Sequence, residues 1–123
     1  KEHTFINAAF GVMGLETALS VISTVMVGSG LLDWAGVAQV MSVRPARIAG
    51  LSGQGRPIAV GEPANLTLVD PSAKVTVDRD ASVSLSRNNP WHGRALTGTV
   101  YATLVAASQP FSRAPSYDTG TDL

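Results

Sequence analysis

Two histidines, His3 and His92, are the side chains best suited to bind a metal or transfer a proton. They lie far apart in the sequence, and neither belongs to a ligand spacing such as His-x-His or His-Glu-x-x-His. The chain has no cysteine, so it can form neither a thiolate metal site nor a disulfide. We therefore expect both histidines in exposed loops, and we predict that this chain contains no catalytic residue and no metal ligand.

Gly11 and Gly14 form the other candidate site, because closely spaced glycines can cradle an anion. They do not form a phosphate-binding loop, since no strand is predicted before them and no lysine follows. Two interpretations stay open: the glycines allow close backbone packing, or they open a helix whose unpaired N–H groups hold an anion. Glu16 would then lie in the first turn of that helix, where a negative charge is favourable.

Apolar residues three or four positions apart predict one helix before Gly28, with a shared face of Leu15, Leu19, Ile22 and Met26. A second helix is expected to begin after Asp33, whose carboxylate can accept unpaired N–H groups of the first turn. Its buried side would comprise Trp34, Val37, Val40 and Met41. A short third helix is predicted over residues 45–49, opened by Pro45 and closed by Gly50.

After Gly50 the pattern changes to that of strands. We predict strands over residues 66–69, 74–77 and 96–105, the first ended by a turn at Asp70 and Pro71. The segment 108–123 is polar and lacks periodicity, which predicts an irregular tail. The chain is thus an α+β piece whose apolar helices find no sufficient partner surface within it.

The composition is that of a globular domain, with 45% apolar and 15% charged residues among 123. Nine basic and nine acidic residues balance, so no electrostatic feature favours nucleic acid or an anionic membrane as a partner. The longest apolar stretch, residues 18–32, is too short and too polar to span a bilayer. No secretory signal is visible and cysteine is absent, so we expect a cytoplasmic protein.

Three motifs of this chain resemble those of bacterial class I dihydroorotases, members of the cyclic amidohydrolase superfamily. The first is Phe10-Gly11-Val12-Met13-Gly14-Leu15-Glu16-Thr17-Ala18-Leu19. The second is Arg44-Pro45-Ala46-Arg47-Ile48-Ala49-Gly50-Leu51, followed by Ile58, Gly61 and Ala64-Asn65-Leu66. The third is Ser86-Arg87-Asn88-Asn89-Pro90-Trp91-His92-Gly93, followed by Leu96, Gly98 and Val100. The second motif would also admit hydantoinases and allantoinases, whereas the first and third indicate dihydroorotase more narrowly.

The resemblance implies a C-terminal piece of an enzyme built on a (β/α)8 barrel with a small composite β-domain. Residues 1–53 would be the last loop and helices of this metal-dependent hydrolase barrel. Residues 54–105 would be the C-terminal part of the small β-domain. The lack of a partner surface for the apolar helices is then explained, because they would pack on barrel strands that this chain does not contain.

The resemblance further implies a function: the reversible cyclisation of N-carbamoyl-L-aspartate to dihydroorotate in pyrimidine biosynthesis. The zinc ligands and the catalytic aspartate would come from segments upstream, so the complete enzyme binds zinc and this piece alone is inactive. Only Phe10 and Gly11 carry over as substrate-binding residues, through their backbone. Two alternatives remain, a non-catalytic partner of aspartate transcarbamoylase and another cyclic amidohydrolase. The expected partners are the substrate and either a second copy or aspartate transcarbamoylase.

Residues 106–123 depart from the family's ending, which continues with a short strand and turn. With suitable codons, one base inserted after Ala106 restores Val-Ala-Gly-Glu-Ser-Thr-Val-Leu-Ala-Gly-Thr-Glu-Leu and a stop. We therefore predict that this irregular tail arises from a shifted reading frame.

Overall fold

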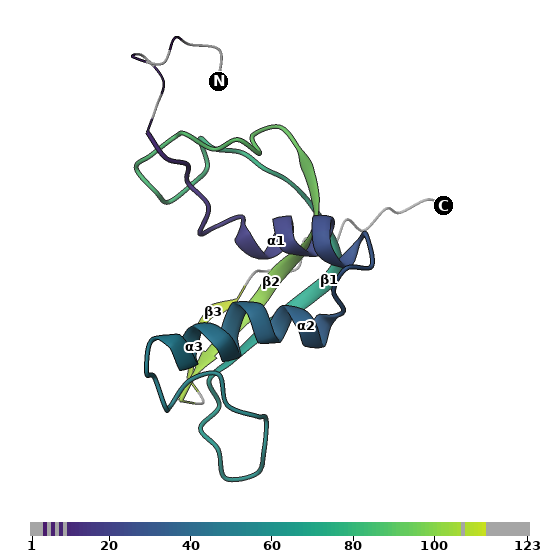
Figure 1. Cartoon of the computed structure of the whole chain (residues 1–123), viewed down its shortest axis with the longest axis vertical. Helices are drawn as coiled ribbons and strands as arrows, with labels where there is room; N and C mark the ends of the chain where they lie inside the picture. Colours follow the sequence, from purple (N-terminus) through teal and green to yellow (C-terminus); the bar gives the residue numbers. More distant parts are fainter. Residues whose placement is uncertain (1–3, 5, 7, 9, 107, 113–123) are drawn as a thin grey trace, which may run out of the picture.

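The computed structural model describes residues 4, 6, 8, 10–106 and 108–112. Helices cross a narrow antiparallel sheet, and irregular loops extend from both ends of it (Figure 1). The loop over residues 78–94 lies at one end, beside the N-terminal segment, and the loop over residues 51–65 lies at the other. The first of these loops contributes to the candidate site.

The first helix, α1 (Ala18–Ile22), continues directly into a π-helical turn, η2 (Ser23–Val27). The side chains that this helix buries are small and polar, with Ser20 7% and Ser23 4% exposed. The apolar side chains expected on its face are either exposed, as at Leu15, or half-buried, as at Leu19, Ile22 and Met26. The fully covered part of this helix's contact with the sheet is therefore made by hydroxyl-bearing side chains.

Hydroxyl groups of the first helix bind the backbone of the central strand, β2 (Ala95–Val105). The Ser20 hydroxyl donates to the Gly98 carbonyl at 2.6 Å, and the Thr24 hydroxyl accepts from the Thr97 amide at 2.7 Å. Gly98 has a φ of +86°, and a Cβ there would lie 2.8 Å from the Ser23 Cβ. This helix–strand junction, formed by Ser20, Ser23, Thr24, Thr97 and Gly98, therefore requires glycine at position 98.

The second and third predicted helices form one continuous helix through α2 (Trp34–Ala38), a π-helical turn η3 (Gln39–Val43) and α3 (Arg44–Ile48). The N-cap prediction is confirmed, because an Asp33 carboxylate oxygen accepts from the Gly36 amide at 2.7 Å. The expected break at Pro45 is absent. Proline has no N–H and its ring crowds the preceding turn, and the wider π turn just before it accommodates both defects.

The sheet has the order β1-β2-β3, with β1 (Leu66–Thr76) antiparallel to β2. The turn predicted at Asp70 is instead an irregularity within one long strand, since pairing resumes at Lys74 opposite Thr97. An Asp70 carboxylate oxygen accepts from the amides of Ser72 and Ala73, at 2.9 and 3.0 Å. These bonds satisfy the two amides that the irregularity leaves without a partner on β2, so the strand does not end there.

The third strand, β3 (Ser108–Ser112), lies where the sequence predicted an irregular tail. It pairs antiparallel with β2, from Ala102 opposite Ser112 to Val105 opposite Ser108. Backbone pairing with an open strand edge needs no alternating side-chain pattern, and a proline is tolerated in an edge strand. The sequence pattern therefore missed this strand. The remainder of the predicted tail, residues 107 and 113–123, lies outside the described residues.

The apolar core is small among the residues that the structure describes. Its buried members are Val37, Ala46, Val77, Leu96 and Ala102. Large apolar side chains such as Ile58, Val60, Val83 and Leu85 are instead exposed. Within the described part of the chain, no helix is long and apolar enough to cross a membrane.

Candidate functional site

Two of the three motifs, far apart in the sequence, meet at one end of the molecule. The Met13 amide donates to the Asn88 carbonyl at 2.9 Å, and the Asn88 side-chain amide donates to the Gly11 carbonyl. In Figure 1 the purple N-terminal segment accordingly runs beside the green loop. Asn88 thus ties residues 11–13 to the loop over residues 78–94 at two points.

Phe10 and Gly11, the predicted substrate-binding pair, lie at the exposed edge of this contact. The Phe10 side chain is 96% exposed, and Gly11 adopts a φ of +67° with open space where a Cβ would lie. Among the described residues, none accepts a hydrogen bond from the amide of Phe10 or Gly11. Unpaired backbone N–H groups on an exposed segment can bind an anionic group such as a carboxylate.

The predicted helix start is not where the glycines lie. Residues 12–14 have no regular structure, residues 15–17 form a turn, and α1 begins only at Ala18. Gly11 therefore does not present N–H groups at a helix terminus, and this interpretation of the glycines was wrong. The expectation for Glu16 was also wrong, because the first turn of α1 contains no acidic residue.

Glu16 instead binds the loop over residues 78–94. Its carboxylate accepts from the Ser82 hydroxyl at 2.6 Å, the Ser84 amide at 3.1 Å and the Val83 amide at 3.3 Å. The Ser82 hydroxyl and, next, the Ser84 amide hold the pKa of this carboxyl below its usual value, because they stabilise the ionised form. Glu16 is fully exposed, so this attachment is open to solvent.

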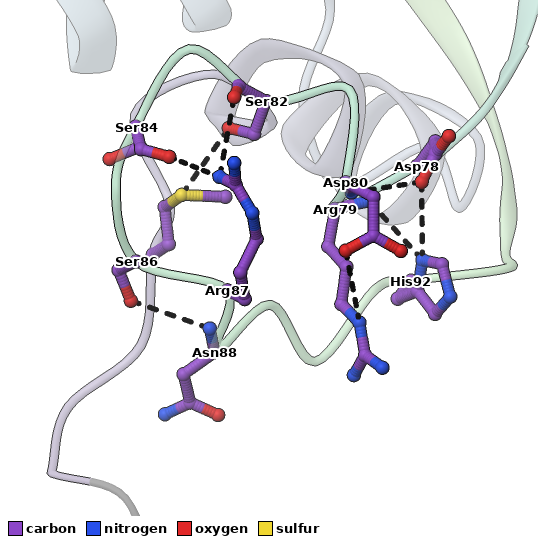
Figure 2. A network of polar contacts seen from close by, with 10 residues as sticks. Asp78, Arg79, Asp80, Ser82, Ser84, Ser86, Arg87, Asn88 and His92 are labelled. Atoms are coloured by element: carbon purple, nitrogen blue, oxygen red, sulfur yellow. Dashed lines mark hydrogen bonds and ion pairs between the residues drawn. The ribbon is translucent and has the colours of Figure 1, made fainter.

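The loop itself is organised by internal polar contacts, drawn in Figure 2. The Arg87 guanidinium donates to the backbone carbonyls of Ser82 and Ser84. The Ser86 hydroxyl accepts from the Asn88 backbone amide at 3.3 Å. The segment that binds Glu16 and the residue that binds Gly11 are thereby held in one local structure.

His92 lies exposed in the same loop, as predicted, whereas His3 lies outside the described residues. Its Nδ1 accepts from the Arg79 amide at 3.2 Å and lies 3.9 Å from an Asp78 carboxylate oxygen (Figure 2). The described residues include no cluster of three or more histidine, cysteine, aspartate or glutamate side chains that could hold a metal. The donors within this part of the chain therefore do not fit a zinc centre.

Sequence comparison matches this chain to curated proteins, although no family model matches it. It is 53% identical over 103 residues to dihydroorotase of Streptomyces coelicolor, covering 84% of this chain. It is 55% identical over 101 residues to that of Mycobacterium leprae, covering 82% of this chain. The chain is related to the dihydroorotases. It spans about a quarter of their length, 24% of each of these two proteins.

Structural comparison indicates the same superfamily as these dihydroorotase relatives. The L-hydantoinase (dihydropyrimidinase) from Arthrobacter aurescens superposes on 88% of this chain with a TM-score of 0.77 and 29% sequence identity. The superposition covers 24% of that enzyme. The chain is thus similar to an α+β segment of a cyclic amidohydrolase, and its dihydroorotase-like motifs include the residues of the Gly11–Asn88 contact.

The sequence named Phe10 and Gly11 as the substrate-binding pair, which stays a prediction, and it did not indicate that Asn88 binds Gly11 or that Glu16 binds the loop. Asn88 lies in the third motif and Glu16 in the first, yet nothing in their spacing indicates a contact across 77 and 66 residues. The one available signal was that both motifs resemble the same family, which suggests a shared site. Only the tertiary structure shows which atoms meet.

Proposed function

We propose that this chain is part of a dihydroorotase, which reversibly cyclises N-carbamoyl-L-aspartate to dihydroorotate in de novo pyrimidine biosynthesis. The observation that carries the proposal is its 53% identity to the Streptomyces coelicolor enzyme over 103 residues. Because the chain spans only a quarter of that protein, the activity belongs to a complete enzyme of which this chain is one segment.

Within that enzyme, the backbone of Phe10 and Gly11 contacts the substrate. The support is geometric: both residues are exposed, and their amides have no acceptor among the described residues. N-carbamoyl-L-aspartate and dihydroorotate both carry carboxylates, and backbone N–H groups bind carboxylates through charge-assisted hydrogen bonds. A side chain larger than hydrogen at Gly11 would be strained at positive φ and would crowd this approach.

The zinc and the catalytic aspartate of the complete enzyme come from segments other than the described residues. The support is the donor chemistry of this chain, which has no cysteine, and whose described residues include no cluster of three metal-binding side chains. We therefore expect the isolated chain to be inactive. Zinc retained in a one-to-one ratio after dialysis against a weak chelator would contradict this part of the proposal.

In the complete enzyme, residues 1–53 form the last loop and helices of the barrel, and residues 54–105 form part of the small β-domain. The superposition on a hydantoinase supports this placement. The small core supports it as well, because the exposed apolar side chains need a further surface to pack against.

A hydantoinase is the second candidate, and its support is the same superposition, with a TM-score of 0.77. The identity of 29% to that enzyme is well below the 53% to a dihydroorotase. Both enzymes act on cyclic amides, so the shared fold alone does not separate them. The motif residues around Gly11 and Asn88 favour dihydroorotase.

A segment exchange tests the proposal. The aligned 103 residues of the Streptomyces coelicolor enzyme are replaced by those of this chain, which yields what we call the exchanged enzyme. We expect it to interconvert N-carbamoyl-L-aspartate and dihydroorotate with kcat/KM within about tenfold of its parent, because substitutions accepted in a relative largely preserve packing. The matched control places the same segment in the Arthrobacter aurescens hydantoinase.

An inactive dihydroorotase exchange beside an active hydantoinase exchange would favour the second candidate. Within an active exchanged enzyme, Gly11→Val is expected to raise KM in both reaction directions while zinc content stays unchanged. Unchanged KM values would remove Phe10 and Gly11 from the substrate site.

A further inference from the structure

We propose that Asn88 is a positioning residue that fixes the Phe10–Gly11 backbone for substrate, and that Glu16 anchors the loop carrying Asn88. This inference rests on the proposed function, because it assigns a role within the substrate site proposed there. Asn88 itself does not contact the substrate. It acts through the backbone that it holds.

Asn88 binds the segment on both sides of Val12. Its side-chain amide donates to the Gly11 carbonyl, and its own carbonyl accepts from the Met13 amide at 2.9 Å. Both bonds are made to backbone atoms, so they set the path of the chain independently of its side chains. Residues 12–14 lie in no helix or strand, so they are held by such individual bonds, which also include a 3.4 Å contact from the Ser82 hydroxyl to the Met13 sulfur and a 3.1 Å bond from the Thr17 amide to the Gly14 carbonyl.

The bond to the Gly11 carbonyl also sets the direction of the Val12 N–H group. A peptide unit is planar, and its carbonyl and N–H point in opposite directions. The Gly11 carbonyl points toward Asn88, so the Val12 N–H points away from the loop. No described residue accepts from the Val12 amide, which makes it a third candidate donor beside Phe10 and Gly11.

The loop that carries Asn88 has a second attachment to the same segment. The Glu16 carboxylate accepts from the Ser82 hydroxyl and from the amides of Val83 and Ser84. Arg87 bridges the two attachments, since it binds the carbonyls of Ser82 and Ser84 and precedes Asn88 in the chain. Residues 11–16 and 82–88 therefore form a closed polar clamp. We call these two segments the clamp.

The expected consequence is a change in binding rather than in chemistry. Donors held in place lose less freedom when the substrate binds, so loosening them weakens affinity. The groups that carry out the reaction lie elsewhere, so their geometry is unaffected. Loss of the Asn88 side-chain amide should therefore raise KM and leave kcat nearly unchanged.

The test uses the exchanged enzyme with Asn88→Ala and Asn88→Asp. The aspartate keeps the size of the side chain but cannot donate to the Gly11 carbonyl when ionised. The matched control is Asn65→Ala, which removes a 2.9 Å bond from the Ala106 amide at the far end of β2. Two experiments are made: steady-state kinetics, which gives KM and kcat in both directions, and deuterium exchange of the amides in residues 10–15.

We expect both Asn88 variants to raise KM roughly three- to tenfold, the effect of about one lost hydrogen bond, with kcat within twofold. Exchange in residues 10–15 should become faster, and Asn65→Ala should change neither the kinetic constants nor the exchange. Unchanged exchange would overturn the clamp, and faster exchange with unchanged KM would overturn its link to substrate. If Gly11→Val leaves KM unchanged, the proposed substrate contact fails, and the positioning role fails with it.

Discussion

The helix–strand junction and the clamp both join distant segments through polar groups, but one is buried and the other is exposed. At the junction, Ser20 and Ser23 are almost fully covered and Gly98 allows the close approach. At the clamp, Glu16 is fully exposed and Asn88 is half-buried. Figure 1 shows α1 lying on β2 at the junction, whereas the clamp lies off the end of the sheet.

This difference predicts different consequences of mutation. A buried acceptor that loses its donor is cut off from water, so the full cost of desolvation appears as lost stability. An exposed acceptor can bind water instead, and the loss is small. We therefore expect the junction to govern the free energy of unfolding and the clamp to govern local geometry.

The largest expected effect is that of Gly98→Ala. The new Cβ would lie 2.5 Å from the Ser23 hydroxyl oxygen, and the φ of +86° strains any side chain. Steric overlap and strain together should lower the free energy of unfolding of the exchanged enzyme by about 3 kcal/mol or more. The measurement is chemical denaturation.

Gly93→Ala is the matched control for this substitution. Gly93 lies in the loop with a similar φ of +76°, but a Cβ added there would meet nothing within 4 Å. Gly93→Ala should lower the free energy of unfolding only through the strain of a positive φ, by about 1 kcal/mol. Equal losses for the two variants would show that close approach to the helix contributes nothing at Gly98.

An intermediate effect is expected for Ser20→Ala. It removes the 2.6 Å bond to the Gly98 carbonyl from a buried position, which should cost about 1–3 kcal/mol of unfolding free energy. Ser29→Ala removes a bond of the same length to the Val25 carbonyl, but from an exposed position, and should cost less than about 0.5 kcal/mol. A similar loss for both serines would break the distinction between buried and exposed polar contacts.

The smallest expected effect is a pH dependence confined to the clamp. Hydrogen bonds lower the pKa of Glu16 in the folded protein, so ionised Glu16 favours the closed clamp above its usual value of 4.5. This contribution is lost as the pH falls below 4.5 through the lowered folded pKa, because a protonated carboxyl accepts these bonds poorly. The amide chemical shifts of Val83 and Ser84 should therefore titrate below pH 4.5.

Glu16→Gln is the control for that titration, because it keeps the acceptor oxygen and removes the charge. Its Val83 and Ser84 amide shifts should not change over the same pH range. Asp70, whose pKa is also lowered through its bonds to Ser72, lies in β1 and should leave these two amides unaffected. Titration that persists in Glu16→Gln would assign the effect to another group.

Local features were predictable wherever a short stretch of sequence carries the physical cause. The Asp33 N-cap was predicted because a carboxylate before a helical pattern binds the first turn. The long strand β2 was predicted from its β-branched residues. The Pro45 helix break and the Asp70 turn were predicted in the same way and did not occur, because a π turn and a strand irregularity absorbed them.

In the candidate site, too, features with a cause in the local sequence were predictable and contacts between distant segments were not. Phe10 and Gly11 as substrate-binding residues came from the family resemblance and stay a prediction, whereas the exposed loop position of His92 was predicted from its lack of a ligand spacing and is confirmed. The attachment of Glu16 to residues 82–84 was not predictable, because a carboxylate near a helix start has a sufficient local explanation. Nor was Ser20 a candidate, since a serine among apolar residues carries no sign of which carbonyl it will meet.

The sequence alone determined the order of helices before strands, the N-cap at Asp33 and the relationship to the dihydroorotases. Those properties depend on neighbouring residues or on shared motifs, and both can be read along the chain. The tertiary structure alone decided that Gly98 lies against Ser23 and that Asn88 holds Gly11. These contacts join residues more than 70 positions apart, and their partners are set by how the helix, sheet and loop pack together.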